Sequence, residues 1–195
     1  NIHYSEEKSA LVISMLAFCY IHLKNYDKGF ANLYKILEFN PKFELAHRTI
    51  FYIFDKTIML HEKKYEDRET AEALKPIIKT FQDDDSFASN LLLAVLCWME
   101  KNHDEMFLHL KKVEKLTPDN TYLPYYFAEC HRLRREFDEA IRDFGLFLES
   151  KPEVKNAYTS TVECFYEKSF DLLRQGKYED AKLCLDNGID IAKNF

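Results

Sequence analysis

The fold is decided by residues 118–152, which read PDNTYLPYYFAECHRLRREFDEAIRDFGLFLESKP. The stretch begins and ends on proline, and Pro118 and Pro152 lie 34 residues apart. Ala128 lies 24 residues before the second proline, and Phe144 lies eight residues before it. The same spacing recurs twice more, with Ala94 and Leu110 before Pro118, and with Ala17 and Leu33 before Pro41. Three prolines therefore mark one repeating frame.

Each copy of the frame predicts a pair of antiparallel helices. The small residue lets the first helix approach its partner closely, and large apolar residues one turn away fill the contact. Proline closes each copy, because its missing N–H is harmless at the start of a helix. We therefore predict ten helices, over residues 5–24, 26–39, 43–61, 67–82, 86–101, 103–116, 120–134, 137–149, 153–175 and 178–193.

The composition excludes several other classes of protein. Only four of the 195 residues are glycine and five are proline, too few for the turns of a sandwich or barrel and for a glycine-rich phosphate cradle. The formal net charge is -6 and no basic run exceeds a pair, so we expect no nucleic-acid partner. The apolar runs 10–23 and 91–99 are shorter than the roughly 20 residues that cross a bilayer, so we expect no membrane span.

The five cysteines form no Cys-x-x-Cys pair and their number is odd, which predicts reduced thiols in a cytoplasmic protein. Cys19, Cys130 and Cys164 occupy the same position of the frame, and we expect all three to be small packing residues. The chain opens on Asn1 without a signal peptide, and the missing methionine suggests a trimmed chain or a fragment of a longer one.

The frame resembles the tetratricopeptide repeat, a 34-residue helix–turn–helix unit. The residues that carry the resemblance are Leu16, Ala17, Tyr20, Tyr26, Leu33 and Pro41 in the first copy, Leu93, Ala94, Leu110 and Pro118 in the third, and Phe127, Ala128, Phe137, Ala140, Phe144 and Pro152 in the fourth. The resemblance implies an all-α fold, a right-handed α-α superhelix (solenoid) of about five helix pairs in a single domain over residues 1–195. The pairs are expected near residues 10–43, 44–86, 87–120, 121–154 and 155–195.

Two copies depart from the period. Pro41 and Pro118 lie 77 residues apart, nine more than two periods, and we place the insertion within residues 55–69. Pro76 is expected to kink or shorten the second helix of that copy. The last copy reaches its turn late, which predicts a first helix extended by about two turns.

The candidates for catalysis or metal binding fail on spacing. His61 begins the sequence His-Glu-Lys-Lys-Tyr, which has tyrosine where a zinc-protease helix needs its second histidine. The acidic residues 83–85 precede Ser86, and we expect them to cap a helix rather than bind calcium. We therefore predict no catalytic residue, no metal ligand and no cofactor, and we expect that the chain is not an enzyme.

The resemblance also implies where a partner binds, since the first helices of successive tetratricopeptide repeats line a concave groove. The partner-binding residues predicted at these groove positions are Leu11, Phe18, Leu91, Val95, Trp98, Tyr122, Tyr125, Glu129 and Arg132. We expect the aromatic residues and the arginine from Trp98 onward to be anchors, because such residues often carry the binding energy of interfaces. These groove residues would be covered by a partner protein, by another copy of the chain, or by a further segment of the same protein. Alternatively, tight curvature would bury these residues against neighbouring repeats.

These observations predict a non-enzymatic interaction scaffold that binds a partner helix or peptide in its groove, as part of a larger protein or complex. Self-association is a further mode of covering the groove. Two alternatives stay open from the sequence: a regulatory peptide- or ligand-sensing module of a signalling protein, and a secretion-type chaperone that holds an unfolded client.

Overall fold

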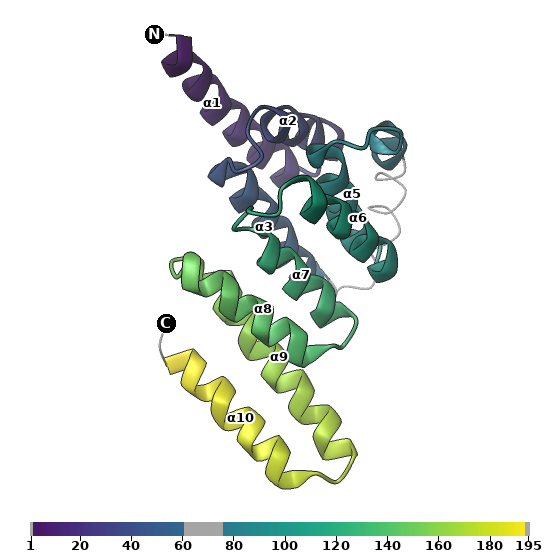
Figure 1. Ribbon diagram of the computed structural model, residues 1–195, viewed down its shortest axis with the longest axis vertical. Coiled ribbons are helices and arrows are strands. Elements are labelled where there is room, and N and C mark those ends of the chain that lie inside the picture. The colour runs from purple at the N-terminus through teal and green to yellow at the C-terminus, as the bar shows by residue number, and fades with distance from the viewer. Residues whose placement is uncertain (1, 61–75, 194–195) are drawn as a thin grey trace. The chain divides into compact units, whose positions relative to one another are not determined.

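The structure is a computed structural model that describes residues 2–60 and 76–193. Their regular structure is helical throughout, which confirms the predicted all-α fold for this part of the chain. The first compact unit, residues 1–120, contains α1 (Ile2–His22), α2 (Tyr26–Phe39), α3 (Glu44–Leu60), α5 (Phe87–Met99) and α6 (His103–Leu116) (Figure 1). The second unit, residues 121–195, contains α7 (Leu123–Leu133), α8 (Phe137–Ser150), α9 (Lys155–Arg174) and α10 (Tyr178–Lys193).

The helices pack as the pairs that the repeat predicts. In the first unit α1 packs on α2 and α5 packs on α6, while α1 also contacts α3 and α2 contacts α5. In the second unit α7 packs on α8 and α9 packs on α10, and α8 contacts α9. The predicted long first helix of the last copy is α9, with 20 residues. Because the chain forms two compact units, the prediction of one continuous domain stays a prediction.

The turn within each pair has the same structure four times. Lys24, Lys101, Arg135 and Gly176 have positive φ angles of 59°, 62°, 62° and 74°, and each lies two residues before the second helix of its pair. The next residue donates its backbone N–H across the turn, from Asn25 to Tyr20 O at 2.8 Å and from Lys177 to Leu172 O at 2.9 Å. This left-handed C-terminal cap satisfies the last carbonyls of the first helix and reverses the chain.

The connection between pairs also repeats. Asn40, Thr117 and Lys151 each precede a frame proline and have φ angles of -145°, -145° and -137°. Proline disfavours the helical region for the residue before it, so these residues leave the helix. Each still donates its N–H to the carbonyl four residues earlier, as Asn40 does to Ile36 O at 2.8 Å. The three prolines therefore end the second helices within one residue of the predicted positions.

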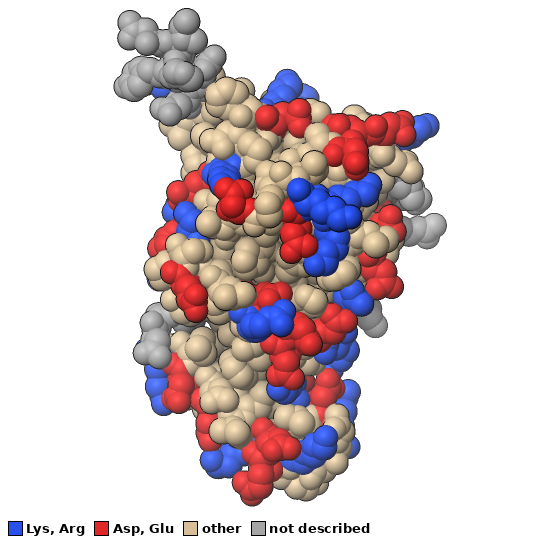
Figure 2. Space-filling view, viewed as in Figure 1, with Lys and Arg blue, Asp and Glu red and all other residues tan. Residues whose placement is uncertain are grey.

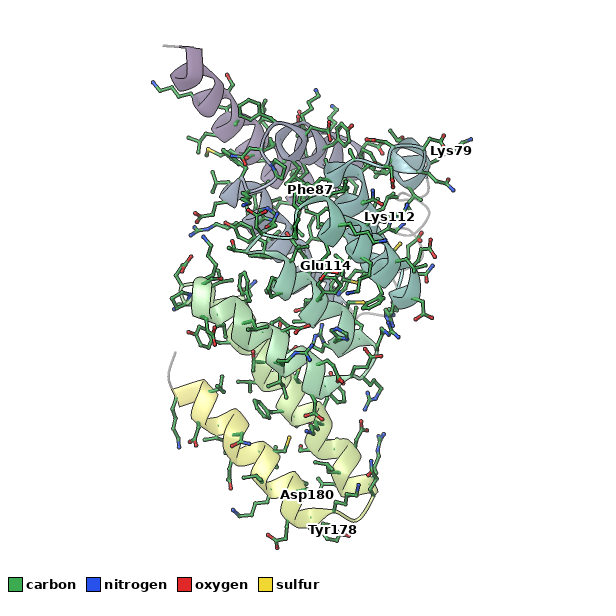
Figure 3. The ribbon with its side chains drawn as sticks, viewed as in Figure 1. Lys79, Phe87, Lys112, Glu114, Tyr178 and Asp180 are labelled. Carbon is green, nitrogen blue, oxygen red and sulfur yellow. The ribbon has the colours of Figure 1, made fainter. Side chains whose placement is uncertain are left out.

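Each unit has a core of aromatic and aliphatic side chains. In the first unit the Phe54 and Trp98 rings meet edge to face, with their centroids 4.6 Å apart. In the second unit Tyr125 packs against Phe144 and Phe147 at 5.6 and 5.2 Å. By contrast, the start of α10 lies at the surface, where Tyr178 is 69% exposed (Figure 3).

Some predictions need correction or lie outside the described residues. Cys130 and Cys164 are buried as predicted, but Cys19 is exposed, because it lies off the buried stripe of α1 that contains Ala17 and Ile21. The sequence around His61 and most of the predicted insertion fall outside the described residues. Of the helix predicted over 67–82, residues 76–81 are described and are helical. In the described part of the chain, no helix is both long enough and apolar enough to cross a membrane.

Candidate functional site

The structure separates the nine predicted groove residues into two groups. Leu11 and Phe18, on α1, are 45% and 41% exposed. The other seven are at most 8% exposed, and they are Leu91, Val95, Trp98, Tyr122, Tyr125, Glu129 and Arg132. The expectation that these seven present an open binding surface is therefore corrected, although a binding role for the set stays a prediction.

The burial of α5 explains three of the seven. All 13 of its residues are buried, so no side of this helix is left for a partner. It packs on α6, α2 and α3 of its own unit. A helix that is apolar all round is typical of such a position, and the run 91–99 carries that signal. The alternative in which neighbouring helices cover these residues therefore describes α5.

Glu129 and Arg132 are used inside the second unit. The Arg132 Nε and Nη2 atoms donate to Glu129 Oε2 at 3.1 and 2.9 Å, and Ser160 Oγ donates to Glu129 Oε1 at 2.8 Å. Burial by itself disfavours the charged guanidinium, but the adjacent Glu129 carboxylate outweighs it and raises the pKa of Arg132. Both charges thus have internal partners, as buried ions require.

The remaining two predicted residues lie beside a groove between α1 and α3. Leu11, Met15 and Phe18 follow one another at i, i+4 and i+7 on α1, so their side chains form one stripe. Met15 is the most exposed of the three, at 62%. The groove has a volume of about 250 Å³ and is lined by Ser14, Met15, Phe18, Cys19, Leu45, Arg48 and Thr49.

The floor of the groove holds one polar group without a partner. Ser14 is 2% exposed, and its hydroxyl has no hydrogen-bond partner among the described residues. The other hydroxyl of the lining, Thr49 Oγ1, donates to Leu45 O at 2.9 Å within α3. A buried hydroxyl that lacks a partner costs free energy, on the order of 1–3 kcal/mol. Ser14 is not one of the nine residues predicted to line a groove.

The rim of the groove is aromatic at one end and charged at the other. The Phe18 and Tyr52 rings lie 4.8 Å apart between centroids, and Tyr52 Oη is hydrogen-bonded to His22 Nδ1 at 2.7 Å. Arg48 is paired with Glu44 at 2.8 Å, one turn earlier on α3, and both side chains are about half exposed. An exposed pair of this kind contributes little and exchanges partners readily.

The apolar surface of α1 extends beyond the groove. Val12, Leu16 and Leu23 are 55%, 44% and 72% exposed on the side of the helix next to the groove stripe. No Asp, Glu, Lys or Arg occurs between Lys8 and Lys24. A contiguous uncharged surface of this kind typically marks an interaction site.

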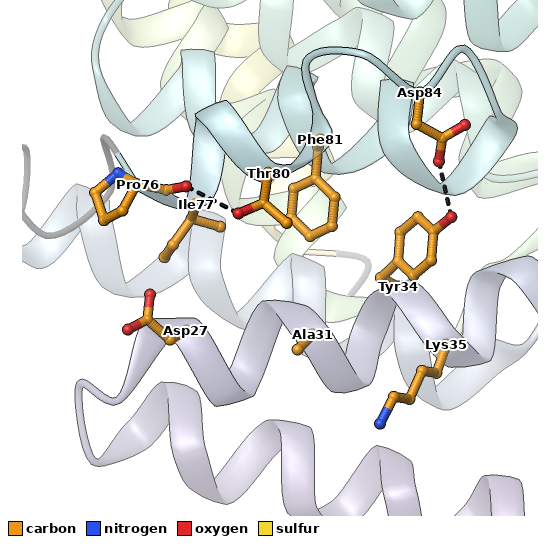
Figure 4. A pocket seen from close by; sticks show the side chains of 9 residues that line it. All are labelled: Asp27, Ala31, Tyr34, Lys35, Pro76, Ile77, Thr80, Phe81 and Asp84. Carbon is orange, nitrogen blue, oxygen red and sulfur yellow. Dashed lines mark hydrogen bonds between the residues drawn. The ribbon is translucent and has the colours of Figure 1, made fainter.

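A second cavity lies in the first unit, between α2 and residues 76–84 (Figure 4). Its volume is about 680 Å³. The Tyr34 hydroxyl donates to Asp84 Oδ2 at 2.7 Å across one end, and the Tyr34 and Phe81 rings stack at 5.3 Å. This hydrogen bond raises the pKa of Tyr34 and lowers that of Asp84. Unlike the groove, the cavity has its polar groups at the Tyr34 end already paired.

A third, smaller cavity lies on the second unit beside α9. The rings of Tyr166 and Phe170 lie 5.3 Å apart there, next to Arg135. Arg135 is held by two hydrogen bonds to Asp171, at 2.7 and 2.8 Å, and by Glu167. Arg135 is thus paired with two carboxylates of α9.

The described residues offer little for catalysis. No group of three or more His, Cys, Asp or Glu side chains among them could hold a metal ion. Burial raises the pKa of the Cys97 thiol to about 12, and it also raises that of Cys164, so both thiols stay protonated and unreactive near neutral pH. Acidic and basic side chains are interspersed over the face seen in Figure 2, without a field of one sign.

Comparison with known proteins does not assign a family. No family model matches the chain, and no curated protein matches it. Among solved structures, the chain is similar to MamA MSR-1 C2, with 14% identity, a TM-score of 0.44, and coverage of 95% of this chain and 98% of that one. A mutant of MamA is similar at 14% identity and a TM-score of 0.41, over 95% of this chain and 99% of that one. At this level the likeness carries no inference about function.

Proposed function

We propose that the chain is a non-enzymatic protein-interaction module that binds an apolar segment of a partner protein in the groove between α1 and α3. Of the nine residues predicted from the sequence, Leu11 and Phe18 belong to this binding surface, and Met15 and Ser14 join them. The seven buried residues lie in the interiors of their own units, three in the first and four in the second.

The observation that carries the proposal is the exposed stripe of Leu11, Met15 and Phe18 beside a groove of about 250 Å³. Fully burying one large apolar side chain contributes about 1.5–3 kcal/mol. A partner that covers these three side chains, each about half exposed, therefore gains on the order of 2–5 kcal/mol before the cost of association. A binding role is favoured over catalysis because the lining offers one unpartnered hydroxyl and an ion pair on the rim, which is too few groups to act as both acid and base.

The experiment is a selection of peptides from a displayed library on the immobilised full chain. Selected peptides are then compared on the variant Met15→Glu and on a matched control, Leu146→Glu, which adds the same charge to a half-exposed leucine of α8. We expect at least about tenfold weaker binding to Met15→Glu and unchanged binding to the control, because a carboxylate in an apolar groove is desolvated without a partner.

Circular dichroism should show equal helicity for both variants, since each substitution is at an exposed position. Peptides that bind Met15→Glu as well as the wild type would refute the groove as the binding site. The sensing-module and chaperone alternatives stay predictions from the sequence, and no contact described above favours either.

A further inference from the structure

We propose that copies of this chain associate head to tail, with α1 of one copy packed on the open face of α9 and α10 of the next. The contact repeats between copies the way in which α9 packs on α7 and α8 within the chain. It uses a different side of α1 from the groove, because neither Val12 nor Leu16 belongs to the lining of the groove. The inference therefore goes beyond the function proposed above.

In each unit, one helix pair is covered by the first helix of the pair that follows it. α3 packs on α1 and α2, and α9 packs on α8 and α7. The covered side includes the residue six positions before the left-handed turn, which is Phe18 in α1 and Glu129 in α7. The Phe18 ring lies 4.8 Å from that of Tyr52 on α3, and Glu129 Oε1 accepts from Ser160 Oγ of α9 at 2.8 Å. A following helix thus contacts the same position in both units.

The pair of α9 and α10 presents this side without a cover from the described residues. Phe170 lies six residues before the turn, at the position of the buried Glu129, and is 45% exposed. Leu173 is 40% exposed, whereas Arg132 at the same position of α7 is buried. Tyr166, one turn before Phe170, is 55% exposed. Exposed apolar side chains therefore occupy positions that resemble those buried by a following helix elsewhere in the molecule.

α1 presents the opposite side of the repeat, also without a cover from the described residues. In α9 that side faces the preceding pair: Cys164 is fully buried near the charges of α7, and Lys168 is paired with Asp138 of α8. Counted back from the turn, the same two positions of α1 are Val12 and Leu16. They are 55% and 44% exposed. α1 thus leaves open the side by which α9 covers the pair before it.

The chemistry of the two open faces matches them to each other. Inside the second unit the junction is closed by ions, since Arg135 donates to Asp171 at 2.7 and 2.8 Å. At the open faces the counterparts of these two residues are Gly176 and Cys19, neither of which brings a charge. Leu16 likewise stands where α9 has a paired lysine. Both faces have therefore exchanged charged residues for uncharged ones, so that apolar side chains meet apolar side chains.

The remaining charges at this contact keep their partners or their water. α1 has no Asp, Glu, Lys or Arg between Lys8 and Lys24. On the face of α9, Glu167 is already paired with Arg135. Glu179, which corresponds to the aspartate that pairs with Lys168, is exposed in the first turn of α10. Docking of α1 therefore leaves no ion buried without a counterion.

The repeat itself favours a helix from a second copy as the occupant. An extended peptide would place backbone N–H and C=O groups against apolar side chains that cannot pair with them. Pairing of α1 with α1 would leave the face around Phe170 open. A head-to-tail contact covers both faces, because each copy supplies one of each, and such a contact propagates until a ring closes or the assembly stays open.

The test is sedimentation velocity of the full chain and of two variants that each block one face. Val12→Glu places a carboxylate on α1, and Phe170→Glu places one on the face of α9. Over roughly a hundredfold range of concentration, we expect the wild type to form larger species as the concentration rises. Each variant should associate at least about tenfold more weakly, because the contact would desolvate a carboxylate that has no partner.

An equimolar mixture of the two variants identifies which faces meet. Val12→Glu keeps the face of α9, and Phe170→Glu keeps the face of α1, so the mixture should form a one-to-one complex and nothing larger. The control Leu146→Glu, on α8, should associate as the wild type does. Association that only one of the two substitutions abolishes would show that identical faces pair, and would overturn the head-to-tail arrangement.

A wild type that stays monomeric over the whole range would also overturn the proposal. Circular dichroism checks that the variants keep their helices, and Leu16→Glu and Leu173→Glu provide a second pair that blocks the same two faces. Peptides selected on the groove should bind Phe170→Glu as tightly as the wild type, because α9 is not part of the groove. Loss of self-association and loss of peptide binding are therefore measured separately.

Discussion

At the scale of single residues, the repeated turn within each pair contains three side chains in a conformation that glycine tolerates better. Lys101 has φ 62° and ends α5, while Gly176 occupies the equivalent position after α9 with φ 74°. A side chain in the left-handed region costs about 1 kcal/mol. We expect Lys101→Gly to raise the free energy of unfolding by about 0.5–1 kcal/mol, and Gly176→Ala to lower it by a similar amount. Urea denaturation followed by circular dichroism measures both, and shifts of the same sign would contradict this explanation.

A pair of residues on α2 and before α5 sets a dependence on pH. The hydrogen bond from Tyr34 lowers the pKa of Asp84, so the stability it provides is present above the ordinary range of a carboxyl and is lost as pH falls through the lowered pKa. The same bond raises the pKa of Tyr34, so the stability is lost again as pH rises through that raised value. We expect Tyr34→Phe to lower the free energy of unfolding by about 0.5–1.5 kcal/mol at neutral pH.

The difference between Tyr34→Phe and the wild type should shrink toward both ends of that pH range. Denaturation midpoints measured from pH 3 to pH 10.5 test it, with pH values chosen from the ordinary pKa values of about 4 and 10. Ser86→Ala is the control, because Ser86 Oγ donates to the same Asp84 Oδ2 at 2.9 Å without a phenol that titrates. A constant difference across the whole range would show that the bond is not responsible.

At the scale of helices, local chemistry made most boundaries predictable. The predicted spans 26–39, 103–116 and 178–193 match α2, α6 and α10 residue for residue. The left-handed turn sets the start of all three, and the residue before proline sets the end of α2 and α6. Both signals depend on nearby sequence. Ser86 also caps α5 as predicted, since its hydroxyl accepts from Ser89 N at 3.2 Å. By contrast, α7 begins at Leu123, later than predicted, because the helix starts next to Pro124.

The contact between α1 and α2 depends on the absence of one side chain. A Cβ atom built on Gly29 would lie 2.5 Å from Ile21 Cδ1, whereas one on Gly145 of α8 would meet nothing within 4 Å. We expect Gly29→Ala to lower the free energy of unfolding by about 1–3 kcal/mol, because the helices must move apart. Gly145→Ala should instead raise it by about 0.5–1 kcal/mol through helix propensity alone. If thermal melting ranks the two variants the other way, close packing at Gly29 is not the reason for its glycine.

At the scale of the whole molecule, the sequence could predict the helix pairs but only part of the site. Burial of Leu91, Val95 and Trp98 depends on helices that are distant in sequence, such as α2 and α3. Periodicity within α5 shows that every side is apolar but not what covers it. Leu11 and Phe18 stay exposed because α1 packs against fewer helices than α5 does. The buried, unpartnered hydroxyl of Ser14 depends on how the helices pack around α1, which the sequence pattern does not specify.

The division into two compact units leads to a prediction about the chain as a whole. The second unit supplies its own aromatic cluster around Tyr125, its own buried ion pair of Glu129 and Arg132, and the bidentate contact of Arg135 with Asp171. We therefore expect residues 121–195, expressed alone, to be helical and to unfold cooperatively in urea, with a slope of about 1 kcal/mol per molar. Arg132→Leu in this fragment should cost about 3–5 kcal/mol, because it leaves a buried carboxylate unpaired, and Glu129→Leu added to it should restore part of that loss. A fragment that shows no cooperative transition would mean that these internal contacts are insufficient, and that the second unit depends on the rest of the chain to fold.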